Sequence, residues 1–243
     1  MSEFPSSRNF SRHCDNLNEV LRTITQIART HKRAIRERDA PAELALRKVH
    51  TLMIGVFAET RLRKIIDDPT GFNAHERRVI WRHSSQDGRW RSSVDLAARK
   101  HWSVPTGAEL RLALPQPARD RVLNVLSLLR GELAPIITHR NKLAHGQWVW
   151  QLKSQSDDQF LSTPHDLDYN YAAIASRQKT LEFIARLVHV LCVSEPTFDR
   201  DFDHIASDIR AEQSRLDGSD YDAFAETLRR SHSEGLRKRG IET

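Results

Sequence analysis

The sequence predicts an all-α protein in which long amphipathic helices pack antiparallel into a bundle. Three long segments, near residues 15–39, 41–67 and 168–193, repeat apolar side chains at steps of three and four, the spacing of one helix face. Only residues 147–163 include a stretch that alternates apolar and polar side chains. We therefore expect helix to dominate, with at most one short β-hairpin or an irregular loop in that stretch.

The first predicted helix begins late and ends in a basic run. Residues 1–14 are polar and predict a mobile start, after which Asp15 or Asn16 can cap a helix that continues to about Asp39. Residues 29–38 are strongly basic, which is typical of a solvated helix face but also of a patch that binds RNA. The candidate RNA-binding residues of this run are Lys32, Arg33 and Arg36.

The second predicted helix carries a carboxylate on its apolar side. Pro41 suits the first turn of this helix, which is expected to end near Asp67. Glu59 lies on the same helix face as Leu52, Gly55, Leu62 and Ile66. A carboxylate on this apolar stripe needs a partner of opposite charge or a hydrogen-bond donor. That partner is either Arg63, one turn further on, or a charged residue of another helix.

Residues 72–117 are the least regular part of the chain and are interpreted as an insertion. Short helices are expected near 74–82 and 93–101, with a loop at 84–90. Tryptophans alternate here with cationic side chains, an arrangement that can stack and clamp single-stranded RNA. The other interpretation is that the tryptophans pack a small subdomain. The tryptophans are Trp81, Trp90 and Trp102, and the cations include Arg89, Arg91 and Lys100.

A further helix, expected to start near Pro117, places an arginine on its apolar seam. The stripe consists of Val122, Leu126, Leu129, Leu133 and Ile136. Continued at the same spacing, it reaches Arg140 and then Leu143, so a lone charge falls where it is costly unless paired. Pro135 lies four residues after Gly131 and should kink or restart the helix between them.

The end of this helix holds the strongest functional motif. Asn141 and His145 are four residues apart and share a face, and Gly146 suits a left-handed cap directly after His145. Arg140-Asn141 followed by His145 resembles the Arg-x4-His motif of the HEPN superfamily, and the resemblance covers about residues 41–193. It implies a helical bundle, a homodimer and a metal-independent endoribonuclease of toxin–antitoxin or antiviral systems. It also implies a role for Glu59, as an acidic residue on one of the first helices of the bundle. Glu59 would orient the Arg140 side chain or adjust the acid–base behaviour of His145.

The chemistry that this resemblance implies needs neither a cofactor nor a metal. His145 would exchange protons with the 2′-hydroxyl or the leaving 5′-oxygen, and Arg140 would neutralise the phosphorane. Asn141 would hold a phosphate oxygen or the imidazole, and a second copy would complete the site. Nearby candidates for RNA binding are Lys142, His139 and Trp148. The alternative is a non-catalytic HEPN-like scaffold that binds RNA or protein.

Composition limits the remaining possibilities. The formal net charge is +6, and residues 1–140 hold 25 of the 38 Lys and Arg, which favours a polyanionic partner such as RNA. The high share of arginine can equally follow from genome composition. Glycine-rich phosphate loops, a nucleophile elbow, an apolar membrane span and a signal peptide are not found. Two distant cysteines fit a reducing cytoplasm.

The predicted organisation has three parts. A basic N-terminal helix (1–40) precedes the HEPN-like bundle (41–193), which contains the 72–117 insertion. A helical extension (194–243) is first acidic and then basic. An antitoxin or another defence-system protein is expected as a control partner on the strength of the resemblance, and no membrane partner is expected.

Overall fold

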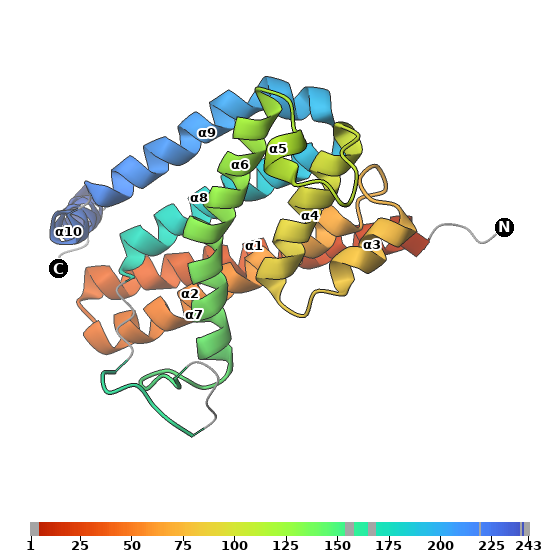
Figure 1. Cartoon of the computed structure of the whole chain (residues 1–243). Helices are drawn as coiled ribbons and strands as arrows, with labels where there is room; N and C mark the ends of the chain where they lie inside the picture. Colours follow the sequence, from red (N-terminus) through yellow and green to blue (C-terminus); the bar gives the residue numbers. More distant parts are fainter. Residues whose placement is uncertain (1–4, 154–157, 165–168, 219, 239, 241–243) are drawn as a thin grey trace.

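A computed structural model describes residues 5–153, 158–164, 169–218, 220–238 and 240 (Figure 1). Within these residues it consists of helices and one isolated β-bridge, so the predicted all-α class is confirmed. The helices are α1 (Pro5–Glu37), α2 (Ala40–Ile66), α3 (Ala74–Trp81), α4 (Gln86–His101), α5 (Leu110–Ala113), α6 (Ala118–Leu128), α7 (Ala134–Ala144), α8 (Tyr171–Val193), α9 (Glu195–Asp217) and α10 (Tyr221–Lys238). No helix in the described ranges combines the length and the apolar character needed to cross a membrane.

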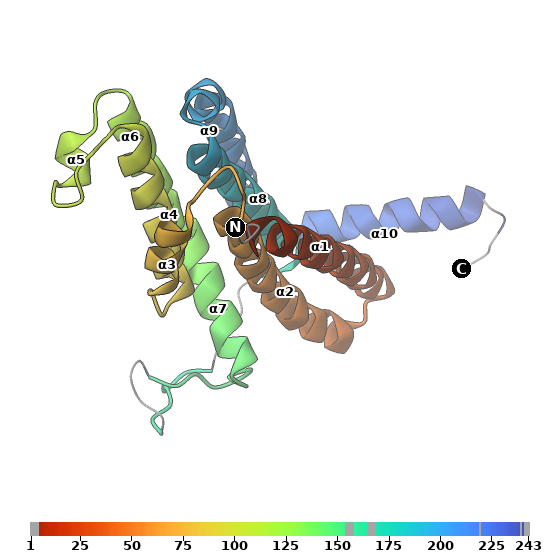
Figure 2. The same cartoon turned by 90° about the vertical axis from the view of Figure 1, so that its right-hand side faces the viewer.

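α1 and α2 form an antiparallel pair and lie side by side (Figures 1 and 2). Asp39 caps α2, with its carboxylate accepting from the Ala42 amide, and Pro41 occupies the first turn as predicted. The predicted mobile start is wrong for residues 5–14, because α1 begins at Pro5. The end of α2 supplies partners for this early part: Lys64 Nζ lies 5.6 Å from the centre of the Phe10 ring.

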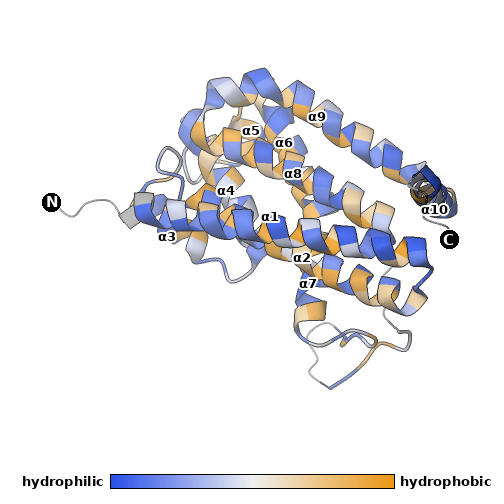
Figure 3. Ribbon diagram, turned by 180° about the vertical axis from the view of Figure 1, so that it is seen from behind, coloured by the Kyte–Doolittle hydropathy of each residue, from blue (hydrophilic) through white to orange (hydrophobic). Residues whose placement is uncertain are grey.

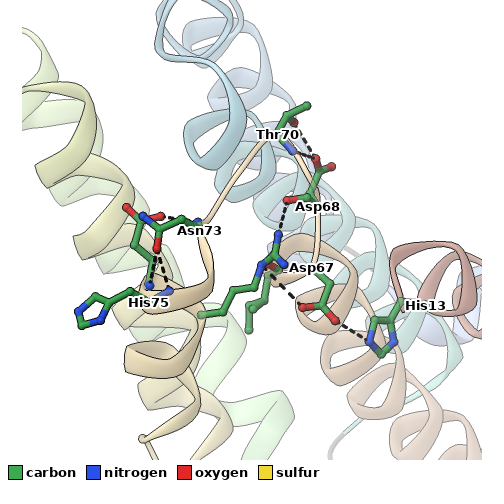
Figure 4. A network of polar contacts seen from close by, with 9 residues as sticks. His13, Asp67, Asp68, Thr70, Asn73 and His75 are labelled. Atoms are coloured by element: carbon green, nitrogen blue, oxygen red, sulfur yellow. Dashed lines mark hydrogen bonds and ion pairs between the residues drawn. The ribbon is translucent and has the colours of Figure 1, made fainter. Parts of the chain in front are cut away.

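The turn between α2 and α3 is fixed by polar contacts (Figure 4). His13 Nε2 of α1 lies 3.1 Å from Asp67 Oδ2, at the end of α2. Asp68 Oδ1 accepts from the backbone amide of Thr70 at 3.0 Å and from its hydroxyl at 2.6 Å. Asn73 then caps α3 by accepting from the backbone amide of His75 at 2.8 Å. These contacts set the direction in which α3 and α4 leave α2.

The predicted insertion packs into the main core. α3 begins and ends close to the expected bounds, whereas α4 starts at Gln86, so the expected loop at 84–90 is mostly helical. Ser85 caps α4 by accepting from the Gly88 amide, a capping residue that apolar periodicity does not reveal. Trp90 is fully buried, and Trp102 packs edge-on against Phe198 at 6.4 Å. For these two tryptophans the packing interpretation is confirmed.

α6 and α7 form one rod that crosses α2 (Figure 1). They are joined by a π-helical turn, η1 (Leu129–Leu133), in which the Ala134 amide donates to the Leu129 carbonyl. Pro135 has no amide hydrogen to donate and its ring crowds the preceding turn, so a wider turn accommodates it. Pro135 was predicted to kink or restart the helix; the structure instead has a π-turn just before it, within one continuous rod.

The C-terminal helices cover the other side of the bundle. α8 is capped by Asn170, which accepts from the Ala173 amide at 2.9 Å. The predicted start of this helix, near residue 168, lies outside the described residues. α9 runs beside α8 and presents mostly hydrophilic residues in Figure 3. α10 projects away from the bundle in Figure 2 and touches α1, where Arg229 Nε donates to the Ile35 carbonyl at 3.1 Å.

The segment after α7 carries exposed apolar side chains. One antiparallel bridge joins Leu152 to Phe160, and the Lys153 amide donates to the Gln159 carbonyl at 2.7 Å. No strand forms among the described residues of this segment, so the expected hairpin is reduced to a single bridge. The exposed apolar residues are Trp148, Val149, Trp150, Phe160 and Leu161, which we call the aromatic loop.

Candidate active site

The site begins at the point where α7 crosses α2. A Cβ atom added to Gly55 would lie 2.2 Å from Arg140 Cβ and 2.4 Å from Arg140 Cγ. No real pair of carbon atoms approaches so closely without a bond, so the Arg140 stem occupies the space that the absent side chain leaves. Gly55 therefore sets both the closeness of the two helices and the path of Arg140.

The Arg140 guanidinium is held by two acceptors. Its Nη2 donates to Glu59 Oε2 at 2.7 Å, and its Nη1 donates to Asn141 Oδ1 at 3.0 Å. The other oxygen of Glu59 accepts from Arg63 Nη2 at 2.9 Å. Both partners considered for Glu59 are thus present at once. The side chains of Arg140 and Glu59 are only 27% and 29% exposed, so this ion pair is partly shielded from water.

A pocket of about 420 Å³ opens beside this ion pair. α2 and α7 form two of its walls, and the end of α3 with the start of α4 forms the third. Its polar lining residues are Glu59, Arg63, Ser84, Ser85, Gln86, Asp87, Arg89, Thr138, Arg140 and Asn141, and its apolar ones are Leu62, Trp81, Ala134 and Ile137. The predicted insertion therefore contributes directly to the environment of Arg140.

His145 lies at the end of α7 and outside this pocket. It is exposed, and its backbone amide donates to the Asn141 carbonyl at 3.0 Å, as expected for the last turn. Gly146 follows with φ +77°, which confirms the predicted left-handed cap. Asn141 lines the pocket, whereas His145 does not. Within one chain, the structure brings together Arg140, Asn141 and Glu59 but leaves His145 at a separate position.

Three candidate RNA-binding residues near the motif take part in local structure. Lys142 Nζ donates to Gln151 Oε1, and the His139 ring packs edge-on against Tyr169 at 5.0 Å. Trp148 Nε1 donates to the Leu143 carbonyl at 2.9 Å, while the ring stays 37% exposed. Of the three, Trp148 offers the surface on which a base could stack.

The basic run of α1 lies away from this site. Lys32 and Arg33 are exposed, and Lys32 Nζ lies 5.4 Å from the centre of the Tyr171 ring. Arg36 is half-buried, with its Nε shielded and unpaired among the described residues. His31, which precedes Lys32, packs against His50, and His50 lies about 14 Å before Glu59 along the α2 axis at 1.5 Å per residue. These three cations therefore form a second, separate basic region.

Two features escaped the sequence interpretation. Trp81, which the sequence analysis grouped with two core tryptophans, lines the pocket. The guanidinium carbons of Arg63 and Arg89 lie 5.3 and 4.9 Å from the centre of the Trp81 ring. His31 and His50 are buried with ring centroids 5.9 Å apart. Neither grouping is visible from spacing, because each unites side chains of different helices whose relative placement depends on tertiary packing.

No group of three or more histidine, cysteine or acidic side chains suited to a metal ion occurs among the residues described. Comparison with known proteins gave no match to a family model, to a curated protein or to a solved structure. Assignment to the HEPN superfamily therefore stays a prediction carried by the motif at Arg140 and His145.

Proposed function

We propose that this protein is a metal-independent endoribonuclease of the HEPN type. One observation carries the proposal: Arg140 is fixed by Glu59 and Asn141 at the edge of a pocket, while His145 stands exposed on the last turn of the same helix. A positioned guanidinium can hold two phosphate oxygens at once. An exposed imidazole can give a proton to a bound substrate or take one from it.

The reaction uses the nucleophile that RNA carries. The 2′-oxygen attacks the adjacent phosphorus and loses its proton to a neutral His145. The bond from phosphorus to the 5′-oxygen breaks, and that oxygen takes a proton from a protonated histidine. Arg140 stabilises the charge that develops on the phosphorane oxygens. The products carry a 2′,3′-cyclic phosphate and a 5′-hydroxyl.

A second copy of the chain completes this scheme. One chain offers a single His145, whereas the two proton transfers are served best by two histidines. Three residues after His145 the aromatic loop begins, and its exposed apolar side chains are of the kind that often marks a protein contact. Pairing of two copies at this end of α7 would bring both motifs to one cleft. The HEPN resemblance adds a toxin or phage-defence role with a control partner.

A non-catalytic scaffold is the second candidate, and one observation favours it. Both terminal nitrogens of Arg140 already have acceptors within the chain, as they would in an ion pair that only joins α2 to α7. In that case the motif stabilises the bundle, and the protein binds RNA or another protein without cleaving it.

Cleavage of structured and unstructured RNA in EDTA separates the two candidates. Wild type should cleave and leave 2′,3′-cyclic phosphate ends, and His145→Ala should lose this activity while remaining folded. His204→Ala is the matched control, because His204 is an exposed histidine of α9 outside the pocket, with its Nε2 4.0 Å from Asp208 Oδ2. If no RNA is cleaved by wild type, the scaffold becomes the better assignment.

A further inference from the structure

The pocket beside Arg140 has more hydrogen-bond donors than the chain uses. Arg89 Nε donates to the His83 carbonyl at 2.8 Å, and its terminal nitrogens have no acceptor among the described residues. Arg63 gives one nitrogen to Glu59 and likewise keeps others free within that part of the chain. Two guanidinium groups therefore present unused N–H donors to the same cavity.

The carboxylates that line the pocket are already neutralised. Each oxygen of Glu59 accepts from a different arginine, Arg63 or Arg140. Asp87 forms an ion pair with Arg91, which does not line the pocket. Three arginines face two engaged carboxylates, so the lining carries a positive excess. An anionic group entering the pocket would meet free donors rather than free acceptors.

The same pocket offers an apolar face and hydrogen-bonding side chains. Trp81, Leu62 and Ile137 supply the apolar part of the lining. Ser84 and Gln86 lie in its polar part, and Gln86 Nε2 is buried without an acceptor in the described structure. A volume of about 420 Å³ is within the range of small-ligand sites. A planar base with polar edges matches this combination.

We propose that this pocket binds one nucleotide of single-stranded RNA, next to the phosphate that is cleaved. The nucleotide's phosphate takes the free donors of Arg63 and Arg89, since guanidinium groups match phosphate geometry. Its base lies against Trp81 and the guanidinium planes beside it, as unstacked bases do on aromatic and arginine surfaces. The inference rests on the proposed ribonuclease function, and it assigns the insertion the task of holding substrate.

Binding is measured apart from cleavage, on RNA that the enzyme cannot cut. The probes are 2′-methoxy tetranucleotides of A, C and U, followed by fluorescence anisotropy, and AMP, adenosine and inorganic phosphate, followed by calorimetry. Arg89→Ala should weaken tetranucleotide binding about tenfold or more, as expected for loss of a charged hydrogen bond. Arg130→Ala, which removes an exposed arginine of η1 outside the pocket, should leave binding unchanged.

Trp81 supplies a second, independent variant. Trp81→Leu should weaken tetranucleotide binding about fivefold or more, the range for loss of one stacked base. Trp81→Phe keeps a ring and should retain most of the affinity, which separates stacking from general damage to the fold. AMP should bind more tightly than both adenosine and inorganic phosphate, because the site takes base and phosphate together.

The outcomes distinguish this proposal from the ribonuclease itself. Affinity that is equal for AMP and inorganic phosphate would mean an anion site only and would overturn the nucleotide assignment. Binding unaffected by Arg89→Ala and Trp81→Leu would overturn it too, even if wild type cleaves RNA. Binding that depends on both residues, with no cleavage of any RNA, would support the pocket and remove the proposed enzyme activity.

Discussion

Gly55 of α2 and Arg140 of α7 share one space, because the stem of the arginine lies where a side chain on Gly55 would be. Glu59, one turn after Gly55, then receives the guanidinium at 2.7 Å. Gly55 and Glu59 therefore act together on Arg140. Gly55 leaves room for its aliphatic carbons, and Glu59 binds its guanidinium.

Gly55→Ala should destabilise the protein by about 1–3 kcal/mol, the usual range for overpacking a tight core contact. The added methyl group forces α7 away from α2 and separates Arg140 from Glu59. Urea unfolding measures the free-energy change. Gly131→Ala is the control, since nothing lies within 4 Å of its added Cβ, and it should be neutral or slightly stabilising. If Gly55→Ala is as stable as wild type, Arg140 does not crowd a side chain at position 55.

Glu59→Gln should cost about 1 kcal/mol of stability, because it leaves Arg140 and Arg63 without their shared counter-charge in a partly buried place. A double-mutant cycle with Arg140→Ala, also followed by urea unfolding, isolates the pair. The cycle should return a favourable coupling energy between Glu59 and Arg140. A coupling energy of zero would mean that the ion pair contributes nothing to the fold.

Stability should fall as the pH is lowered from about 6.5 to about 4. Burial lowers the pKa of His31 to about 4, with His50 adding to the shift, and burial lowers the pKa of His50 to about 4. Their ring nitrogens make no hydrogen bond of ordinary geometry within the described chain, although Gln178 offsets part of the shift on His50. Because both folded pKa values lie below the ordinary 6.5, the unfolded chain binds more protons in this window.

The charged groups around the pair do not reverse this direction. Glu43 raises the pKa of His31, whereas Arg47 lowers it. Urea unfolding at pH 7.5, 5.5 and 4.5 gives the slope of the free energy of unfolding against pH. The double variant His31→Phe, His50→Leu should make this slope smaller. The protonated pair should also loosen α10, since Tyr171 touches both histidines and stacks on Phe224 of that helix at 5.7 Å. An unchanged slope in the double variant would assign the acid sensitivity elsewhere.

Cleavage by His145→Ala should be slower by about 10²- to 10⁴-fold, the usual effect of losing a general acid–base group. Arg140→Ala should lose about 10²- to 10³-fold, by analogy with lost oxyanion donors. RNA with a 2′-methoxy group at the scissile position should resist wild type. Circular dichroism verifies that each variant is folded. Well-folded variants that cleave at the wild-type rate would show that the site is assigned wrongly.

Charge reversal at Lys32 and Arg33 should weaken RNA binding similarly for every sequence, because contacts to phosphates carry no sequence information. Affinity for a long RNA should also fall steeply with salt as counterions are released. Both residues lie in the basic region of α1 rather than beside Arg140, so the cleavage rate at saturating RNA should stay the same. A change in that rate would place the α1 run in the catalytic cleft.

Helical periodicity, together with charged residues on otherwise apolar stripes, predicted much of the contact between α2 and α7. Glu59 and Arg140 were each conspicuous as a charge on an apolar stripe, and the two indeed meet. The close approach at Gly55 was not predicted, since a glycine within a stripe does not name the residue that fills its place. The pocket was not predicted either: Arg63, Trp81 and Arg89 lie on three helices whose relative placement depends on tertiary packing.

Local propensity also failed at the N-terminus, for a related reason. Residues 5–14 are polar and carry little apolar signal, yet they are helical because the end of α2 offers them Lys64 and Asp67 as partners. Tertiary contacts thus extend α1 beyond the part that its own sequence pattern defines.

The π-turn at Leu129–Leu133 sets the angular phase between the two halves of the α6–α7 rod. A π-turn accommodates one residue more than an α-helical turn does, so it acts as a single-residue insertion within an otherwise continuous helix. If the same residues were wound as an uninterrupted α-helix, everything downstream would be rotated by about 100°, the step of one residue, relative to α6. With α6 still seated in the core, Arg140 would then face away from Glu59. The direction in which this arginine points is therefore encoded about ten residues before it, in the length of a turn.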